Sequence, residues 1–243
     1  MMMFKSLRVM IIESDFYARH AINSYLAWDR RTRVKHMLPS LEQAYETLSE
    51  LPELEYPEVI LLDAVLLPTP ELAYQHVTKL MNICSPEIIV MAITQDENIA
   101  REVRRAGAKG YVLKEDVSLQ ISWMVVWAQD YDFIVTQHTS NIFPDAAVLP
   151  IGRDYPELTD RVRQALMLCV VEGMSAELAA DEMGLSPHTI RTYIKEGYSI
   201  LEANDETEYP KELSPQERAF MRFTALSLST IDDKLKQDRS SHS

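Results

Sequence analysis

Polar side chains directly follow the short apolar runs in the first half of this chain. They are Glu13, Ser14, Asp15, Asp63, Thr94 and Lys114. Carboxylates, a hydroxyl and an ammonium group can together hold Mg²⁺ through oxygen ligands and support transfer of a phosphoryl group onto a carboxylate. Taken singly, each residue has an ordinary role as a helix cap or a solvated charge. The phosphoryl-transfer site is therefore predicted only if the fold brings these residues together.

The elements that carry these residues have the pattern of a parallel sheet. Short β-rich runs alternate with helical patterns as far as residue 129, which predicts five strand–helix units. The run PEVILLD is almost wholly apolar, as expected of a strand covered on both faces. The strands are expected at 7–12, 32–37, 57–63, 87–93 and 110–113. The first half is thus predicted to be an α/β, doubly wound sheet of five parallel strands, with its sites beyond the carboxyl ends of the strands.

Composition excludes several classes of protein. No run of about 18 apolar residues could span a bilayer, so a cytoplasmic protein is expected. Cys84 and Cys169 are the only cysteines, which gives no support for a disulfide framework or a zinc site. The six histidines lack ligand spacing and are expected to be solvated or capping. Without a glycine-rich phosphate loop or a nucleophile elbow, the chain is predicted not to be an enzyme.

The second half is helical by pattern and contains a tight turn. Ser186 is predicted to cap a helix with Pro187 at its first position, after a shorter helix that ends at Gly184. Two helices joined in this way are the layout of a helix-turn-helix, whose second helix enters the major groove of DNA. The predicted DNA-contacting residues are Ser186, His188, Thr189, Arg191, Thr192 and Lys195.

The charge of the chain conflicts with this prediction. The formal net charge is -13, and residues 153–203 hold five basic and nine acidic residues. DNA affinity comes largely from cations that neutralise phosphates. Residues 186–195 alone have two positive charges and no negative one. We therefore expect weak binding of double-stranded DNA that requires a homodimer. The alternative is a module that docks on RNA polymerase, a sigma factor or an anti-sigma factor without contacting DNA.

Residues 7–136 resemble the receiver domain of response regulators. The segments that carry the resemblance are VILLDAVLLP, VMAITQDE and GAKGYVLKED. It implies a strand order of 2-1-3-4-5 and transfer of a phosphoryl group from a histidine kinase to Asp63. Thr94 and Lys114 would then contact this group, and Tyr111 would change rotamer to report it on the outer face.

The sequence departs from the receiver pattern after the first strand. Receivers normally have two adjacent acidic residues there, but this chain has Glu13 and Ser14. A serine removes a negative ligand, so Mg²⁺ at Glu13 and Asp63 should bind weakly. Asp15 could compensate only if the loop shifts. Asp63 is accordingly expected to be phosphorylated poorly or not at all.

Residues 157–201 resemble the LuxR-type helix-turn-helix of NarL/FixJ response regulators, and also region 4 of sigma factors. The matching segments are LTDRVRQAL, EGMSAELAADEMGLS and PHTIRTYI, with Leu178 where an acidic residue is usual. The resemblance implies a response-regulator transcription factor. Its expected parts are a receiver-like domain at 1–136, a linker at 137–156, and a helix-turn-helix domain with a helical extension at 157–243.

Two tryptophans in the last helical pattern of the first half suggest an interface. Trp123 and Trp127 are four residues apart in a stretch with apolar residues on more than one face. They are predicted to lie at a dimer interface. Core packing under the linker is an equally good explanation for the same residues.

Overall fold

The chain divides into two compact units, Met1–Pro150 and Ile151–Ser243. The computed structural model describes residues 6–27, 29–117, 120–149, 157–204, 209 and 213–224. None of the helices in these ranges is both long and apolar enough to cross a membrane.

The N-terminal unit is built on one sheet in which every pairing is parallel, in the order β2-β1-β3-β4-β5-β6-β7. The predicted five strands and their order 2-1-3-4-5 are confirmed. The bounds are β1 Leu7–Ile12, β2 Thr32–Leu38, β3 Val59–Asp63, β4 Glu87–Ala92, β5 Gly110–Leu113, β6 Ile134–Val135 and β7 Ala147–Val148. All five residues of β3 are buried, as its continuous apolar run predicts.

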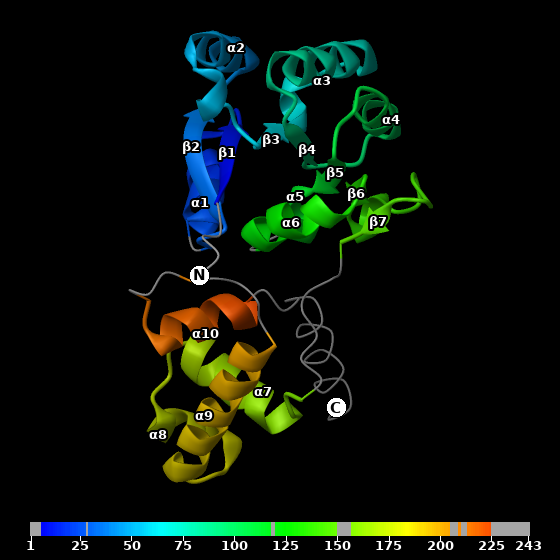
Figure 1. The fold of residues 1–243 in the computed structure, drawn as a ribbon. Coiled ribbons are helices and arrows are strands. Elements are labelled where there is room, and N and C mark those ends of the chain that lie inside the picture. Colours follow the sequence, from blue (N-terminus) through cyan, green and yellow to red (C-terminus); the bar gives the residue numbers. More distant parts are fainter. Residues whose placement is uncertain are drawn as a thin grey trace. The chain divides into compact units, whose positions relative to one another are not determined.

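Helices cover both faces of this sheet (Figure 1). Residues of α2, α3 and α4 pack on one face, and residues of α1 and α6 pack on the other. The bounds are α1 Phe16–Leu26, α2 Leu41–Glu50, α3 Pro70–Cys84, α4 Glu97–Arg105, α5 Lys114–Val117 and α6 Ile121–Trp127. The first four helices begin at a side-chain oxygen that accepts a backbone hydrogen bond from the first turn. These caps are Asp15, Ser40, Thr69 and Asp96.

The sheet has two more strands than the sequence predicts, β6 and β7. Of these, β7 lies in the segment expected to be a linker, and β6 lies just before it. β6 follows α6 and a short 3-10 turn, and its two residues are fully buried. Phe133 and Phe143 pack edge to face beside it, with ring centroids 5.1 Å apart. Strands of two residues are too short to show a period, so the sequence pattern could not reveal them. The sheet thus continues past residue 136 as far as β7, within the segment predicted as a linker; residues 150–156 of that segment lie outside the described residues.

A methyl group on Gly110 would clash with the added strand β6. A Cβ at this position would lie 2.5 Å from Ile134 Cγ1 and 3.0 Å from the Ile134 carbonyl oxygen. We expect Gly110→Ala to lower the free energy of unfolding by about 1–3 kcal/mol, because overpacking a filled core displaces its neighbours. Urea denaturation measures the change. In the double variant with Ile134→Ala the two losses should be less than additive, and full additivity would contradict the clash.

The C-terminal unit is helical, as predicted. Its helices are α7 Asp160–Leu166, α8 Ala176–Met183, α9 Pro187–Ala203 and α10 Pro215–Thr224, and a π-helical turn at Met167–Val171 follows α7. Gly184 ends α8 in the left-handed region with φ 64°, and Ser186 caps α9. Ala219 and Phe223 of α10 pack in the same core as α7 and α9. The predicted helical extension is thus present as α10, and its part beyond residue 224 lies outside the described residues.

Candidate functional site

Parallel strand order brings three of the predicted residues together at one edge of the sheet. Glu13 follows β1, Asp63 ends β3, and Lys114 follows β5. The Lys114 ammonium donates to Glu13 Oε2 at 2.7 Å and to Asp63 Oδ1 at 2.9 Å. The side chains of Glu13 and Asp63 are only 2% and 1% exposed. One cation therefore bridges two buried carboxylates.

The Asp63 carboxylate accepts hydrogen bonds at both of its oxygens. The Ser14 hydroxyl donates to Oδ2 at 2.7 Å, and the Ser14 backbone amide approaches the same oxygen at 3.4 Å. Oδ1 accepts from Lys114 and from the Val65 amide at 3.3 Å. Burial alone would raise the pKa of Asp63, but the donors from Ser14 and Lys114 outweigh it and hold the pKa below its ordinary value. Asp63 is thus ionised and paired.

The neighbouring carboxylate behaves in the opposite way. Burial raises the pKa of Glu13 above its ordinary value, although Lys114 and the Asp15 amide both donate to it. The negative charge of Asp63 acts in the same direction as burial. For Lys114, burial lowers the pKa, but its two carboxylate partners raise it further than burial lowers it. The ammonium therefore stays charged between Glu13 and Asp63.

The cluster offers Mg²⁺ two carboxylates, Glu13 and Asp63, and no acidic side chain at position 14. Magnesium requires a near-octahedral shell of oxygen ligands. Here the Ser14 hydroxyl donates to Asp63, and the Lys114 ammonium occupies one oxygen of each carboxylate. Asp15 does not compensate, since it is exposed and caps α1 by accepting from the Ala18 amide at 2.7 Å. The loop shift that would bring Asp15 into the site is absent here.

Thr94 and Tyr111 lie beside this cluster rather than in it. Thr94 is exposed after β4, and its carbonyl oxygen accepts from the Tyr111 hydroxyl at 3.4 Å. The same hydroxyl accepts from the Asp96 amide at 3.1 Å. Tyr111 is 1% exposed, and burial raises its pKa. Its ring is therefore held inside the unit, where it fixes the loop between β4 and α4.

Trp123 and Trp127 form an aromatic row along α6. Their ring centroids are 5.9 Å apart, and Tyr131 continues the row at 4.3 Å from Trp127. Both tryptophans are half-buried and pack against the core under α1 and α6. Both rings are therefore partly covered by the core of this unit.

The predicted recognition helix presents four polar side chains on one face. His188, Arg191, Thr192 and Lys195 are exposed at the i, i+3, i+4 and i+7 positions of α9. Ile190 is buried on the opposite face. The two remaining predicted residues serve the helix cap instead. Ser186 Oγ accepts from the Thr189 amide at 3.1 Å and lies 2.9 Å from the Thr189 hydroxyl.

An acidic residue missed by the sequence analysis contacts this face. Glu177 of α8 forms an ion pair with Arg191, and both side chains are about 60% exposed. The pKa of Glu177 is lowered by its own backbone amide and by the Ser175 hydroxyl as well as by Arg191. The two residues are fourteen positions apart on different helices, so no periodic pattern in the sequence pairs them. A cation expected to contact DNA is thus held by a carboxylate.

The outer surface of α8 is acidic and carries an exposed apolar side chain. Glu177, Asp181 and Glu182 are exposed, and Leu178 beside them is 60% exposed. Leu178 is the position at which the LuxR-type pattern usually has an acidic residue. The departure therefore places an unburied leucine on a negatively charged face.

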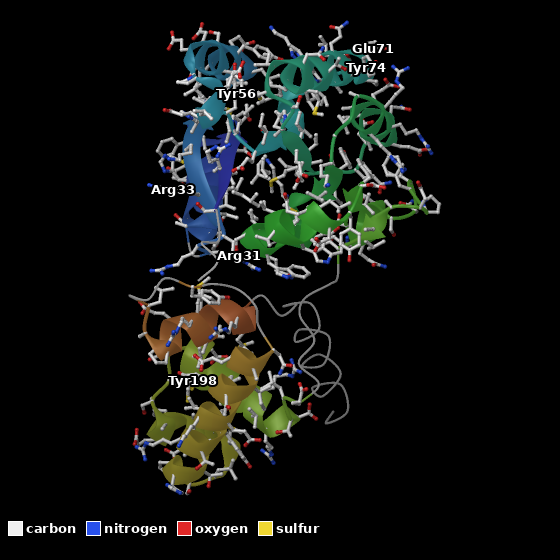
Figure 2. All side chains as sticks on the ribbon, viewed as in Figure 1. Arg31, Arg33, Tyr56, Glu71, Tyr74 and Tyr198 are labelled. Carbon is white, nitrogen blue, oxygen red and sulfur yellow. The ribbon has the colours of Figure 1, made fainter. Side chains whose placement is uncertain are left out.

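A shallow groove between α3 and α4 contains none of the predicted residues. Figure 2 labels Glu71 and Tyr74, two of the residues that line it. Arg105 pairs with Glu102 and lies over the Tyr74 ring, 4.4 Å from its centroid. The cation of this groove is therefore already engaged within it.

The C-terminal unit matches a known family of helix-turn-helix domains. Residues 156–201 match the family model described as sigma-70, region 4. No curated protein matches the chain.

Several solved structures of response regulators are similar to the chain at low sequence identity. RcsB from Salmonella typhimurium is 15% identical with a TM-score of 0.46, over 90% of this chain and 98% of that chain. A complex of the response regulator RcsB with DNA is 16% identical with a TM-score of 0.47, over 91% and 98%. The signal receiver domain of NarL from Mycobacterium tuberculosis is 17% identical with a TM-score of 0.44, over 51% and 98%.

Proposed function

We propose that the chain is a transcription regulator that binds double-stranded DNA through α9. The observation that carries the proposal is the exposed face of His188, Arg191, Thr192 and Lys195 on a helix that follows a tight turn. Cations and hydroxyl groups on one helical face are suited to phosphates and base edges in the major groove. The match of residues 156–201 to sigma-70 region 4 supports the same function.

Binding is expected to require two copies of the chain. One recognition face offers only two cations, Arg191 and Lys195, and one of them is paired with Glu177. Two half-sites would double the number of phosphate contacts. The aromatic row of Trp123, Trp127 and Tyr131 is the surface that we assign to the homodimer.

Selection of the full-length protein against randomised duplex DNA at low salt tests this function. A repeated half-site should be enriched, and the affinity for it should fall as salt rises, because binding releases counterions from the phosphates. Failure to enrich any sequence would contradict DNA reading by α9.

For the N-terminal unit, we propose a receiver-like module that works largely without phosphorylation. Asp63 already has four donors, and the second acidic position is Ser14, whose hydroxyl is one of them. A histidine kinase would therefore meet an acceptor whose two oxygens are already hydrogen-bonded to Ser14 and Lys114, beside a position 14 that supplies no acidic ligand for Mg²⁺. The regulatory role that fits this arrangement is constitutive dimerisation.

A second candidate function is protein docking, which the surface of α8 favours. An acidic face with exposed Leu178 is suited to a basic and apolar partner, such as RNA polymerase, a sigma factor or an anti-sigma factor. Direct binding of the full-length chain to these proteins, together with no enrichment of DNA, would favour this function over DNA reading.

Replacing Glu177 by glutamine tests how its ion pair with Arg191 affects DNA binding. Glu177→Gln releases Arg191 and removes one negative charge beside the DNA-facing surface. We expect DNA affinity to rise about two- to fivefold, the range expected from an exposed ion pair. A fluorescence anisotropy titration against the selected duplex measures the change. Glu182→Gln removes an equal charge from α8 without a bond to Arg191, so it should raise affinity less. Equal gains in both variants would contradict a specific role for the ion pair.

A further inference from the structure

Three side chains of metal-ligand type meet at the end of β5, outside the cluster around Asp63. Glu115 and Asp116 lie on α5, and His138 lies on the 3-10 turn Gln137–Thr139. One ligand atom of each residue lies within 4.8 Å of the others. An imidazole and two carboxylates therefore converge from segments 22 residues apart.

Rigid elements hold both segments in place. β5 and β6 pair in parallel, with Tyr111 opposite Val135. The Thr136 hydroxyl accepts from the Leu113 amide at 3.1 Å, and the Thr139 hydroxyl donates to the Tyr111 carbonyl at 3.4 Å. Thr136 and Thr139 are fully buried. The turn that carries His138 is thus fixed to the strand that leads into α5, as a preorganised site requires.

The histidine already faces the carboxylates. His138 Nδ1 is hydrogen-bonded to Asp116 Oδ1, and the His138 backbone amide donates to Asp116 Oδ2 at 3.4 Å. The imidazole and the Asp116 carboxylate therefore already lie within reach of one shared ligand position.

We propose that Glu115, Asp116 and His138 bind a first-row divalent transition-metal ion, with Zn²⁺ as the representative. Zinc takes imidazole nitrogen and carboxylate oxygen as ligands, and three protein ligands leave a position for water. Mg²⁺ and Ca²⁺ prefer oxygen ligands alone, so the imidazole selects against them. The bound ion would join α5 to the β6–β7 extension.

Calorimetric titration of Zn²⁺ into the tag-free full-length chain tests the proposal. We expect one site that His138→Gln weakens at least about tenfold, because replacing even an outer partner of a metal ligand costs that much. His20→Gln is the matched control, since His20 is also exposed but lies on α1. It should leave the affinity unchanged. Equal affinity in the His138→Gln variant and the natural chain would overturn the proposal.

Two further measurements show whether the Zn²⁺ ion binds at Glu115, Asp116 and His138 rather than elsewhere. Addition of Zn²⁺ should shift the NMR signals of the His138 ring, and Asp116→Asn should suppress that shift. A large excess of Mg²⁺ should not displace the ion. Displacement by Mg²⁺, or a His138 ring that does not respond to Zn²⁺, would show that the ion binds elsewhere.

Discussion

Replacing Ser14 by aspartate is expected to turn Asp63 into a magnesium-dependent phosphoryl acceptor. The substitution removes the hydroxyl that donates to Asp63 Oδ2 and supplies the missing negative ligand beside it. A bound Mg²⁺ ion would stabilise the charge that develops on the transferred group by several kcal/mol. We therefore expect labelling of Ser14→Asp by acetyl phosphate to be at least about tenfold faster than that of the natural chain. Phosphate-affinity electrophoresis measures the labelled fraction with time.

A second measurement detects the binding of Mg²⁺ itself. In Ser14→Asp, three carboxylates share one ammonium, so Mg²⁺ should raise the midpoint of thermal unfolding by mass action. The natural chain should show little such shift. Ser14→Asn is the matched control, because it has nearly the size of aspartate but no charge, and it should gain neither labelling nor the Mg²⁺ shift. Labelling of the natural chain as fast as Ser14→Asp, and lost in Asp63→Asn, would show that Ser14 does not limit phosphorylation.

The elements that position these residues follow from local patterns in the sequence. Four of the five main strands are largely apolar, whereas β2 contains charged residues, and α9 begins at Ser186, which caps it as predicted. Because parallel strands end at one edge, Glu13, Asp63 and Lys114 could be expected to meet. The same argument does not say which donor reaches which oxygen. It also does not say whether Ser14 caps a helix or donates to Asp63, because that depends on the path of the loop between β1 and α1.

The features that the sequence did not predict all depend on contacts between distant segments. β6 and β7 have two residues each, too few for a period, and they are held by neighbours such as Phe143. The Glu177–Arg191 pair and the approach of His138 to Asp116 join residues on different elements. Pattern analysis detects spacing within an element. It cannot detect a pair whose geometry is set by how two elements pack.

Removing the guanidinium of the recognition helix is expected to weaken DNA binding about tenfold or more. Arg191 is exposed on α9 and is one of two cations on its reading face. Loss of an arginine that contacts a base costs about 1–3 kcal/mol, whereas loss of a phosphate contact also lowers the salt slope by about one. Anisotropy titrations of Arg191→Ala at several salt concentrations therefore report both the loss and the kind of contact.

The control for this variant is an arginine on the other unit. Arg33→Ala removes an exposed guanidinium from β2 and changes the net charge by the same amount, so it should leave DNA affinity nearly unchanged. Combining Glu177→Gln with Arg191→Ala should abolish the gain expected from Glu177→Gln alone, since that gain acts through the freed guanidinium. If Arg191→Ala bound the selected duplex as tightly as the natural chain, α9 would not be the reading helix. The acidic face of α8 would then be the better explanation of what this unit binds.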